Sequence, residues 1–261
     1  MNTSFHQTLL GIVLFALQPS AGAANPQIED PELKACMERS LPQKAMTQKL
    51  TFSVFEGDEA IDSTSADLLW KRGEEGLSKV IVRITAPADR AGIAVLALEK
   101  PKGDPEFNVY MPEQRKARRV AGRTIDASMF GTDFSYEDLE ERDVNQSDFK
   151  LLGEETVDGQ ACWKIESTPK KGKSSQYSKV VSWMRKDIYY PVRYEMYAKE
   201  QMVRKLFYRR IEKVNGVWSA LEMEMHDLRR KGRTVLKTEK LQYNVPLQDT
   251  MFTLQALRRG E

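Results

Sequence analysis

The sequence is poor in the residues that most enzymes use for catalysis and metal binding. It contains 2 histidines and 2 cysteines among 261 residues, and no Gly-rich phosphate loop or nucleophile elbow occurs. Nucleotide, serine-hydrolase and zinc chemistry therefore have no support in the sequence. His226 shares a strand with Glu222 and Glu224, and a lone histidine in such a polar setting is usually solvated. We expect no enzyme activity, no metal site and no cofactor.

The sequence also lacks an excess of one charge and a segment long enough to span a membrane. The 40 Lys and Arg residues are balanced by 38 Asp and Glu residues, which gives no general case for nucleic-acid binding. The apolar run 9–17 is too short to cross a bilayer, and the small residues Ala-Gly-Ala at 21–23 are typical of a signal-peptidase site. We expect a cleaved signal peptide over 1–23 and a secreted mature chain without a transmembrane segment.

The two cysteines are Cys36 and Cys162. An oxidising compartment would permit a disulfide between them, which would tie an N-terminal helix expected over 31–43 to a strand. Two unpaired thiols, one on the helix and one in the strand, are the alternative. The sequence leaves both open.

Most of the remaining chain alternates between apolar and polar residues, as strands do. Gly-containing turns, including Asp158-Gly159 and Asn215-Gly216, separate some of these segments and are strong hairpin signals. Ten or more consecutive strands with short loops predict one meandering antiparallel sheet, in a single domain over 24–261. The predicted strands are 50–55, 66–72, 80–84, 93–98, 107–111, 150–155, 161–167, 177–185, 190–197, 202–213, 217–228 and 234–243.

The stretch 110–139 departs from this alternation. Its centre reads Met-Phe-Gly-Thr-Asp-Phe-Ser-Tyr-Glu-Asp-Leu over 129–139. Gly131 permits a turn, and Thr132, Asp133 or Ser135 can cap a short acidic helix, with Ser135 and Asp138 at the spacing of a capping box. We expect this acidic helix, which includes Glu137 and Asp138, to lie on the surface. An ordinary loop-to-helix junction explains the pattern, and a specialised site is the alternative.

Five basic residues lie near the start of this stretch: Arg115, Lys116, Arg118, Arg119 and Arg123. They fit a solvated strand and turn. They equally fit an arginine cluster at a cavity mouth, which would hold a phosphate or carboxylate headgroup or dock an acidic partner.

Methionine and tyrosine side chains gather on a few of the later predicted strands. Such a stripe is often plain core, but methionine is adaptable and also suits a surface that accommodates variable apolar ligands. The candidate residues of a ligand cleft are Tyr190, Tyr194, Met196, Leu206, Leu221, Met223 and Met225.

Several motifs together resemble the outer membrane lipoprotein-sorting (LolA-like) family of periplasmic proteins. The resemblance runs from about residue 51 to 257 and includes Tyr-x-Pro at 110–112 with the arginines after it, the 129–139 motif, Lys-Leu-Leu-Gly-Glu-Glu at 150–155, Val-Asp-Gly at 157–159, Cys-Trp at 162–163, and Tyr-Pro-Val-Arg-Tyr-Glu at 190–195. It implies a curved antiparallel sheet that forms an incomplete barrel closed by short helices around an apolar cavity.

The resemblance also implies a function, namely a non-catalytic, soluble periplasmic carrier that binds lipid or lipoprotein acyl chains in an apolar cleft. The rim or lid of that cleft would be formed by Tyr110, Arg115, Arg118, Arg119, Phe130, Gly131 and Phe134. Since family members are often encoded near membrane transporters of the resistance-nodulation-division (RND) type, such an exporter is an expected partner. The alternative function is a periplasmic adaptor of an RND-type transporter that carries no lipid itself.

Overall fold

The structure is a computed structural model that describes residues 44–101, 105–120, 126–139, 147–172 and 175–259. The expected signal peptide, the helix expected over 31–43, and Cys36 and Arg123 lie outside these residues. The chain divides into two compact units. The described part of unit 1 comprises 147–172 and 175–233, and that of unit 2 comprises 44–101, 105–120, 126–139 and 234–259. A single domain over 24–261 stays a prediction.

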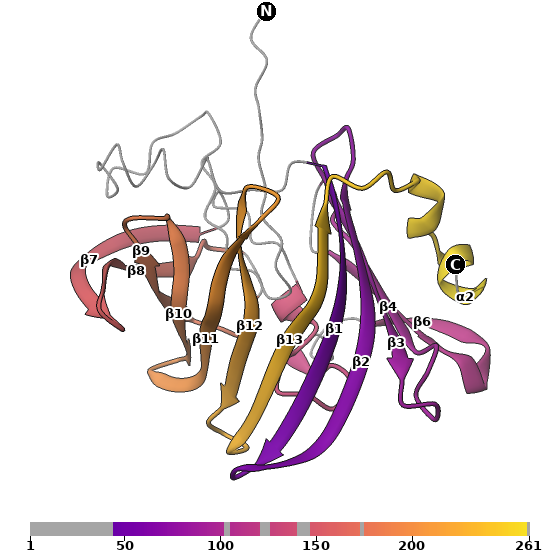
Figure 1. Ribbon diagram of the computed structural model, residues 1–261, viewed down its shortest axis with the longest axis horizontal. Coiled ribbons are helices and arrows are strands. Elements are labelled where there is room, and N and C mark those ends of the chain that lie inside the picture. The colour runs from indigo at the N-terminus through magenta and orange to yellow at the C-terminus, as the bar shows by residue number, and fades with distance from the viewer. Residues whose placement is uncertain (1–43, 102–104, 121–125, 140–146, 173–174, 260–261) are drawn as a thin grey trace, which may run out of the picture. The chain divides into compact units, whose positions relative to one another are not determined.

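Thirteen antiparallel strands are described, and the order of hydrogen-bonded neighbours is β6-β5-β4-β3-β2-β1-β13-β12-β11-β10-β9-β8-β7 (Figure 1). The strands are β1 (Ala45–Glu56), β2 (Glu59–Arg72), β3 (Ser78–Ala86), β4 (Ala94–Leu98), β5 (Glu106–Met111), β6 (Lys116–Val120), β7 (Ser147–Val157), β8 (Gln160–Pro169), β9 (Lys179–Arg185), β10 (Tyr190–Ala198), β11 (Gln201–Val214), β12 (Val217–Asp227) and β13 (Gly232–Tyr243). The predicted meander is confirmed except that β13 returns to lie beside β1.

The predicted incomplete barrel is confirmed in part, as one antiparallel sheet with short helices, but the sheet is neither closed nor strongly curled. Strands β6 and β7 are the two ends of the strand order and do not pair with each other. Closure into a barrel requires a consistent strand tilt and stagger, which alternation of apolar residues does not specify. Alternation in the sequence therefore predicted the strands but not the curvature of the sheet.

Local turn chemistry explains why the hairpins form where the sequence predicted them. Asp158 and Gly159 join β7 to β8, and Asn215 and Gly216 join β11 to β12. All four residues have positive φ, as the two-residue hairpin turns favoured between twisted strands require. Glycine and asparagine adopt this conformation at low cost.

In unit 2 both faces of the sheet are covered by other parts of the same unit. One face, called the Ile81 face, packs against η5 (Asp249–Phe252) and α2 (Leu254–Arg259), where Phe252 and Leu257 join Ile81 and Leu96 in one apolar cluster. The opposite face carries Phe52 on β1 and is called the Phe52 face. α2 is the one α-helix among the described residues, and it lies on the Ile81 face. It therefore does not cover the Phe52 face.

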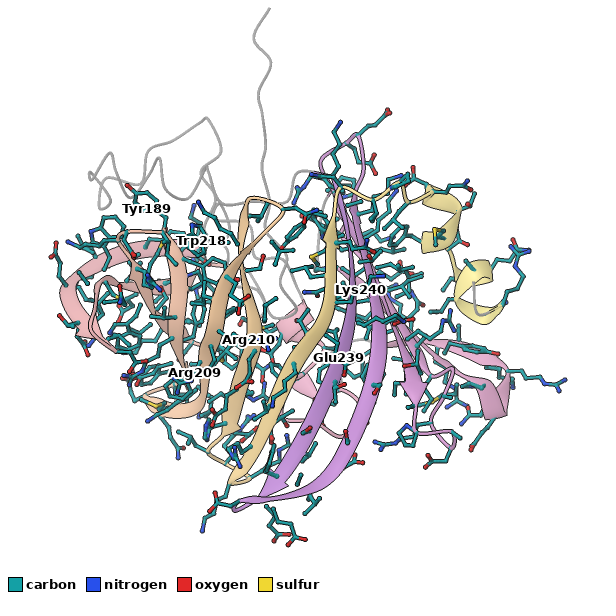
Figure 2. The ribbon with its side chains drawn as sticks, viewed as in Figure 1. Tyr189, Arg209, Arg210, Trp218, Glu239 and Lys240 are labelled. Atoms are coloured by element: carbon teal, nitrogen blue, oxygen red, sulfur yellow. The ribbon has the colours of Figure 1, made fainter. Side chains whose placement is uncertain are left out.

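Unit 1 has two chemically different faces. Tyr194, Leu206 and Met225 stand opposite one another on β10, β11 and β12, and define the methionine face. The other face, called the Trp183 face, interleaves aromatic rings with cations. The Arg193 guanidinium lies 4.4 Å from the Trp183 ring centre, and Arg209, labelled in Figure 2, lies 4.9 Å from that of Phe207. These cations cover apolar rings that would otherwise contact water.

Candidate functional site

The 128–138 loop is a compact turn held by its own polar groups. Phe130 and Gly131 both have positive φ and reverse the chain. The Met129 N–H donates to the Phe134 carbonyl at 2.7 Å, and the Thr132 hydroxyl donates to the Met129 carbonyl at 2.7 Å. The loop is therefore ordered by local hydrogen bonds.

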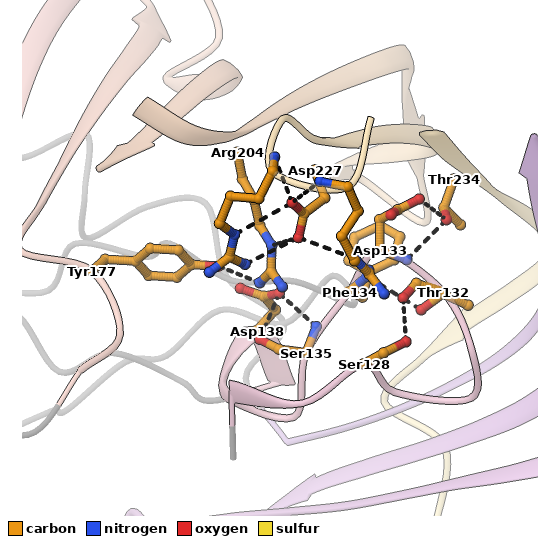
Figure 3. A network of polar contacts seen from close by, with 12 residues as sticks. Ser128, Thr132, Asp133, Phe134, Ser135, Asp138, Tyr177, Arg204, Asp227 and Thr234 are labelled. Carbon is orange, nitrogen blue, oxygen red and sulfur yellow. Dashed lines mark hydrogen bonds and ion pairs between the residues drawn. The ribbon is translucent and has the colours of Figure 1, made fainter. Parts of the chain in front are cut away.

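The loop packs on the Phe52 face of unit 2. Phe134 is fully buried and meets Phe52 edge-on with ring centres 6.2 Å apart, and Tyr136 lies 6.5 Å from Phe107. The Thr234 hydroxyl of β13 accepts from the Asp133 N–H at 3.0 Å and donates to the Asp133 carboxylate at 2.7 Å (Figure 3). Aromatic packing and a reciprocal polar pair together fix the loop to the strands.

A capping interaction starts the short helix η3 (Glu137–Leu139) that follows. The Ser135 N–H and the Ser135 hydroxyl both donate to the Asp138 carboxylate, at 2.8 and 2.9 Å. The predicted Ser135–Asp138 spacing is thus confirmed as a capping contact. The interpretation of this acidic segment as a surface helix is wrong, because Glu137 and Asp138 are 3% and 4% exposed.

The residues proposed as a rim or lid do not form one surface. Phe134 is buried, Phe130 and Tyr110 are half-buried, and Gly131 is exposed. The assignment of these residues to a rim or lid stays a proposal. If the loop moved as a lid, Phe134 would have to leave its contact with Phe52.

The basic residues proposed for the rim are exposed, but their side chains do not point in one direction. Arg118 pairs in register with Val109 and Arg119 with Asn108 on the neighbouring strand β5. Successive strand residues point to opposite faces, so Arg118 and Arg119 cannot hold the same small headgroup. Arg115 ends the 3-10 helix η1 (Pro112–Gln114) in a left-handed conformation.

The residues of the predicted cleft come together on the methionine face but are mostly covered. Leu221 is half-buried, while the other six are 3% exposed or less: Tyr190, Tyr194, Met196, Leu206, Met223 and Met225. The Tyr208 ring lies 5.7 Å from that of Tyr194 and 5.9 Å from that of Tyr190. The predicted stripe of methionine and tyrosine side chains is therefore present, and most of these side chains are buried in this structure.

An ion pair that the sequence analysis missed lies buried on the methionine face. Arg204 of β11 and Asp227 of β12 are paired in register, and the Arg204 Nε donates to the Asp227 carboxylate at 3.1 Å (Figure 3). Their side chains are 2% and 1% exposed. Arg204 also donates to the Tyr177 hydroxyl at 2.6 Å. The signal was present, since Arg204 and Asp227 fall in phase with Leu206 and Met225.

The Asp227 carboxylate accepts hydrogen bonds from more than one neighbouring residue. The Arg229 N–H donates to this carboxylate at 3.0 Å, and the Arg229 guanidinium lies 3.0 Å from it. Burial opposes ionisation, but hydrogen bonds from Arg229 and the charges of Arg204 and Arg229 outweigh it and lower the pKa of Asp227 to about 2. The carboxylate is therefore ionised at every physiological pH.

No catalytic constellation emerges among the described residues. They contain no group of His, Cys, Asp and Glu arranged to hold a metal ion, and none of their helices is long and apolar enough to cross a membrane. His226 lies 2.7 Å from Glu224 and edge-on to Phe207, on the Trp183 face. Burial raises the pKa of the Cys162 thiol, which favours its neutral form. Its pairing with Cys36 stays a prediction.

Comparison with known proteins identifies relatives of this architecture. A family model described as an uncharacterized protein matches residues 76–259, and no curated protein matches the chain. A DUF1329 family protein from Desulfovibrio piger is 33% identical, with a TM-score of 0.79 over 84% of this chain and 92% of that one.

Two further structures share the fold at lower identity. A domain named for outer membrane lipoprotein sorting, from Vibrio parahaemolyticus, is 24% identical with a TM-score of 0.77 over 83% of this chain and 92% of that one. A LolA superfamily protein from Nitrosomonas europaea is 22% identical with a TM-score of 0.68 over 84% and 94%. These matches confirm the resemblance that the sequence motifs indicated: the chain belongs to the DUF1329 family and has the fold of LolA-like lipoprotein-sorting proteins.

Proposed function

We propose that this protein is a non-catalytic carrier in the periplasm that shields the acyl chains of a lipid or lipoprotein from water. The observation that carries the proposal is the methionine face of unit 1. Methionine, leucine and tyrosine side chains gather there, including Tyr194, Met196, Leu206, Met223 and Met225. The likeness to a lipoprotein-sorting domain and to a LolA superfamily protein supports the same function.

The chemistry of this face suits a variable apolar cargo. Methionine has a flexible, polarisable side chain that fills irregular spaces, so Met196, Met223 and Met225 can rearrange around an acyl chain. Each methylene group that leaves water contributes about 0.8 kcal/mol to binding. Because most side chains of the methionine face are buried in this structure, cargo can enter only after a rearrangement that exposes them.

The direct test is native mass spectrometry, combined with lipid extraction, of protein purified from the periplasm. The proposal predicts a co-purifying lipid or acylated species, and a delipidated protein that takes up an acyl probe again. A clean mass for the chain alone, together with no uptake of the probe, would contradict the carrier function.

A matched pair of variants tests where the acyl chain binds. Leu221 is half-buried at the margin of the methionine face, so Leu221→Glu is expected to weaken acyl uptake while the protein stays folded. Leu228→Glu is the control, because Leu228 is 42% exposed. Equal uptake by the two folded variants would place the acyl chain elsewhere.

One observation favours the second candidate, a periplasmic adaptor of an RND-type transporter. The proposed cleft residues other than Leu221 are buried as they would be in an ordinary core. An adaptor of this kind would co-purify with a membrane protein and without lipid. The same mass spectrometry therefore separates the two candidates.

A further inference from the structure

Positive charge is concentrated in one part of unit 2. The segment 112–120 and α2 together hold six basic residues and one acidic residue, Glu113, a formal net charge of +5 in a chain whose total is +2. All six basic side chains are exposed. We call this set the basic corner, and it consists of Arg115, Lys116, Arg118, Arg119, Arg258 and Arg259.

Packing within unit 2 brings the two segments of the basic corner together. α2 lies against β5 and β6 (Figure 1). Leu257 of α2 belongs to an apolar cluster against which Ala117 of β6 packs, and the Arg83 guanidinium donates to the Leu257 carbonyl at 3.2 Å. Arg258 and Arg259 follow Leu257 directly. The basic end of α2 is therefore held beside the basic strand.

β6 carries its cations along an edge of the sheet. Among the described strands it pairs with β5 alone. Arg118 and Arg119 point to opposite faces, so they do not converge on one small group. Long side chains on both faces of an edge strand can nevertheless reach past that edge. The arrangement suits an extended negative surface that approaches the sheet edge-on.

Two exposed apolar side chains lie in the same region. Met111, which is opposite Lys116 in the β5–β6 pair, is 37% exposed, and Leu254, the first residue of α2, is 40% exposed. Peripheral membrane proteins combine cations with apolar side chains that enter the headgroup region. A lipid surface would accommodate both kinds of side chain, whereas nucleic acid would attract only the cations.

We propose that the basic corner docks on a membrane surface that contains anionic lipid. Headgroup phosphates neutralise the cations, and each cation close to such a surface strengthens binding by about fivefold. This inference goes beyond the proposed function, because it concerns where the protein binds and not what it carries. It requires no change in the methionine face and lies wholly within unit 2.

The experiment is co-sedimentation of protein purified from the periplasm with lipid vesicles. One set contains phosphatidylglycerol mixed with phosphatidylethanolamine, and the other contains phosphatidylcholine alone. At low ionic strength the protein should bind the anionic vesicles at least about tenfold more tightly than the neutral ones. Added salt should weaken this binding, because exposed charges are screened over about 8 Å at physiological ionic strength.

A matched pair of double variants locates the contact. Arg258→Gln with Arg259→Gln removes two cations of the basic corner and should weaken binding to anionic vesicles by at least about tenfold. Lys237→Gln with Lys240→Gln is the control, since it removes two exposed cations from β13 of the same unit and should have little effect (Figure 2 labels Lys240). Both variants change the net charge equally. Lys116→Gln with Arg118→Gln replaces the first variant if that one does not fold.

The outcomes are distinct from those of the carrier test. Equal binding to anionic and neutral vesicles, or no binding to either, would overturn the membrane assignment and leave an acidic protein as the partner to seek. Equal weakening by the two double variants would also overturn it, because net charge alone would then govern binding. Uptake of an acyl probe in the absence of vesicles tests the carrier function separately, so either proposal can fail while the other stands.

Discussion

The methionine face of unit 1 and the Phe52 face of unit 2 are both buried, but the contacts that hold their side chains differ. On the Phe52 face the 128–138 loop inserts Phe134 against Phe52 and bonds Asp133 to Thr234. On the methionine face the charged anchor is the Arg204–Asp227 pair, and methionine, leucine and tyrosine are prominent among the other buried side chains.

The methionine face is better suited to rearrangement of its side chains than the Phe52 face. Directional hydrogen bonds and an edge-on aromatic contact specify one position for the 128–138 loop. Apolar contacts between flexible methionines are non-directional and permit several arrangements of similar energy. We therefore propose that an acyl chain binds the methionine face and that the loop has a structural role.

The largest expected effect concerns the anchor of the methionine face. Asp227→Asn leaves Arg204 buried without its counter-charge and should lower the free energy of unfolding by about 3–5 kcal/mol. The control is Asp187→Asn, which removes the exposed pair of Asp187 with Arg185 and should change stability by about 0–1 kcal/mol. Urea denaturation measures both. Equal effects would show that the buried pair is no anchor.

Acid should weaken the same anchor in the unmodified protein. The pKa of Asp227 falls from its ordinary value of 3.8 to about 2 in the folded state. The stability it contributes is present above pH 3.8 and is lost as the pH falls through about 2, and it amounts to about 2 kcal/mol. Unfolding free energies measured across this window should fall more steeply in the parent than in Asp227→Asn. Parallel pH dependences in the two proteins would show that protonation of Asp227 does not weaken the anchor.

A smaller effect is expected at the anchor of the 128–138 loop. Thr234→Val keeps the shape of the side chain but leaves the Asp133 N–H and carboxylate without this partner, which should cost about 1–2 kcal/mol. Thr250→Val, at an exposed threonine of the same unit, should be neutral. Hydrogen exchange of the Met129 and Phe134 amides should accelerate in the first variant only. Unchanged exchange would mean that the loop is held by its aromatic residues alone.

The smallest effect on folding is expected at the exposed arginines of β6. The double variant Arg118→Glu and Arg119→Glu should alter stability by less than about 0.5 kcal/mol, because neither side chain is buried. If either residue holds an anionic headgroup or an acidic partner, the variant should weaken that binding, with a salt dependence. Single variants then show which of the two arginines makes the contact, because their side chains point to opposite faces. Unchanged binding would leave these residues as a solvated surface.

The sequence predicted the strands well because strand identity is a local property. Alternation and positive-φ turns such as Asn215-Gly216 require no knowledge of distant residues. The Ser135–Asp138 cap was predictable for the same reason, as its partners are three residues apart. The methionine stripe followed from alternation on β10, β11 and β12.

The sequence did not predict what depends on long-range contacts. Glu137 and Asp138 looked like surface residues because charged side chains are rarely buried. Their burial follows from the docking of the loop on Phe52, Phe107 and Thr234, which are distant in sequence. Arg204 and Asp227 were passed over for the same reason, although each lies in phase with apolar neighbours. Sheet curvature depends on tilt and stagger that side-chain alternation does not encode.

We propose that the methionine face, and not the loop-covered Phe52 face, adapts to an acyl chain. Methyl NMR of methionine-labelled, delipidated protein titrated with dodecanoate tests this proposal most directly. We predict large shift changes at Met196, Met223 and Met225 and little change at Met129, which is buried in the 128–138 loop. Changes confined to Met129, or spread equally over all four methyl groups, would contradict the account.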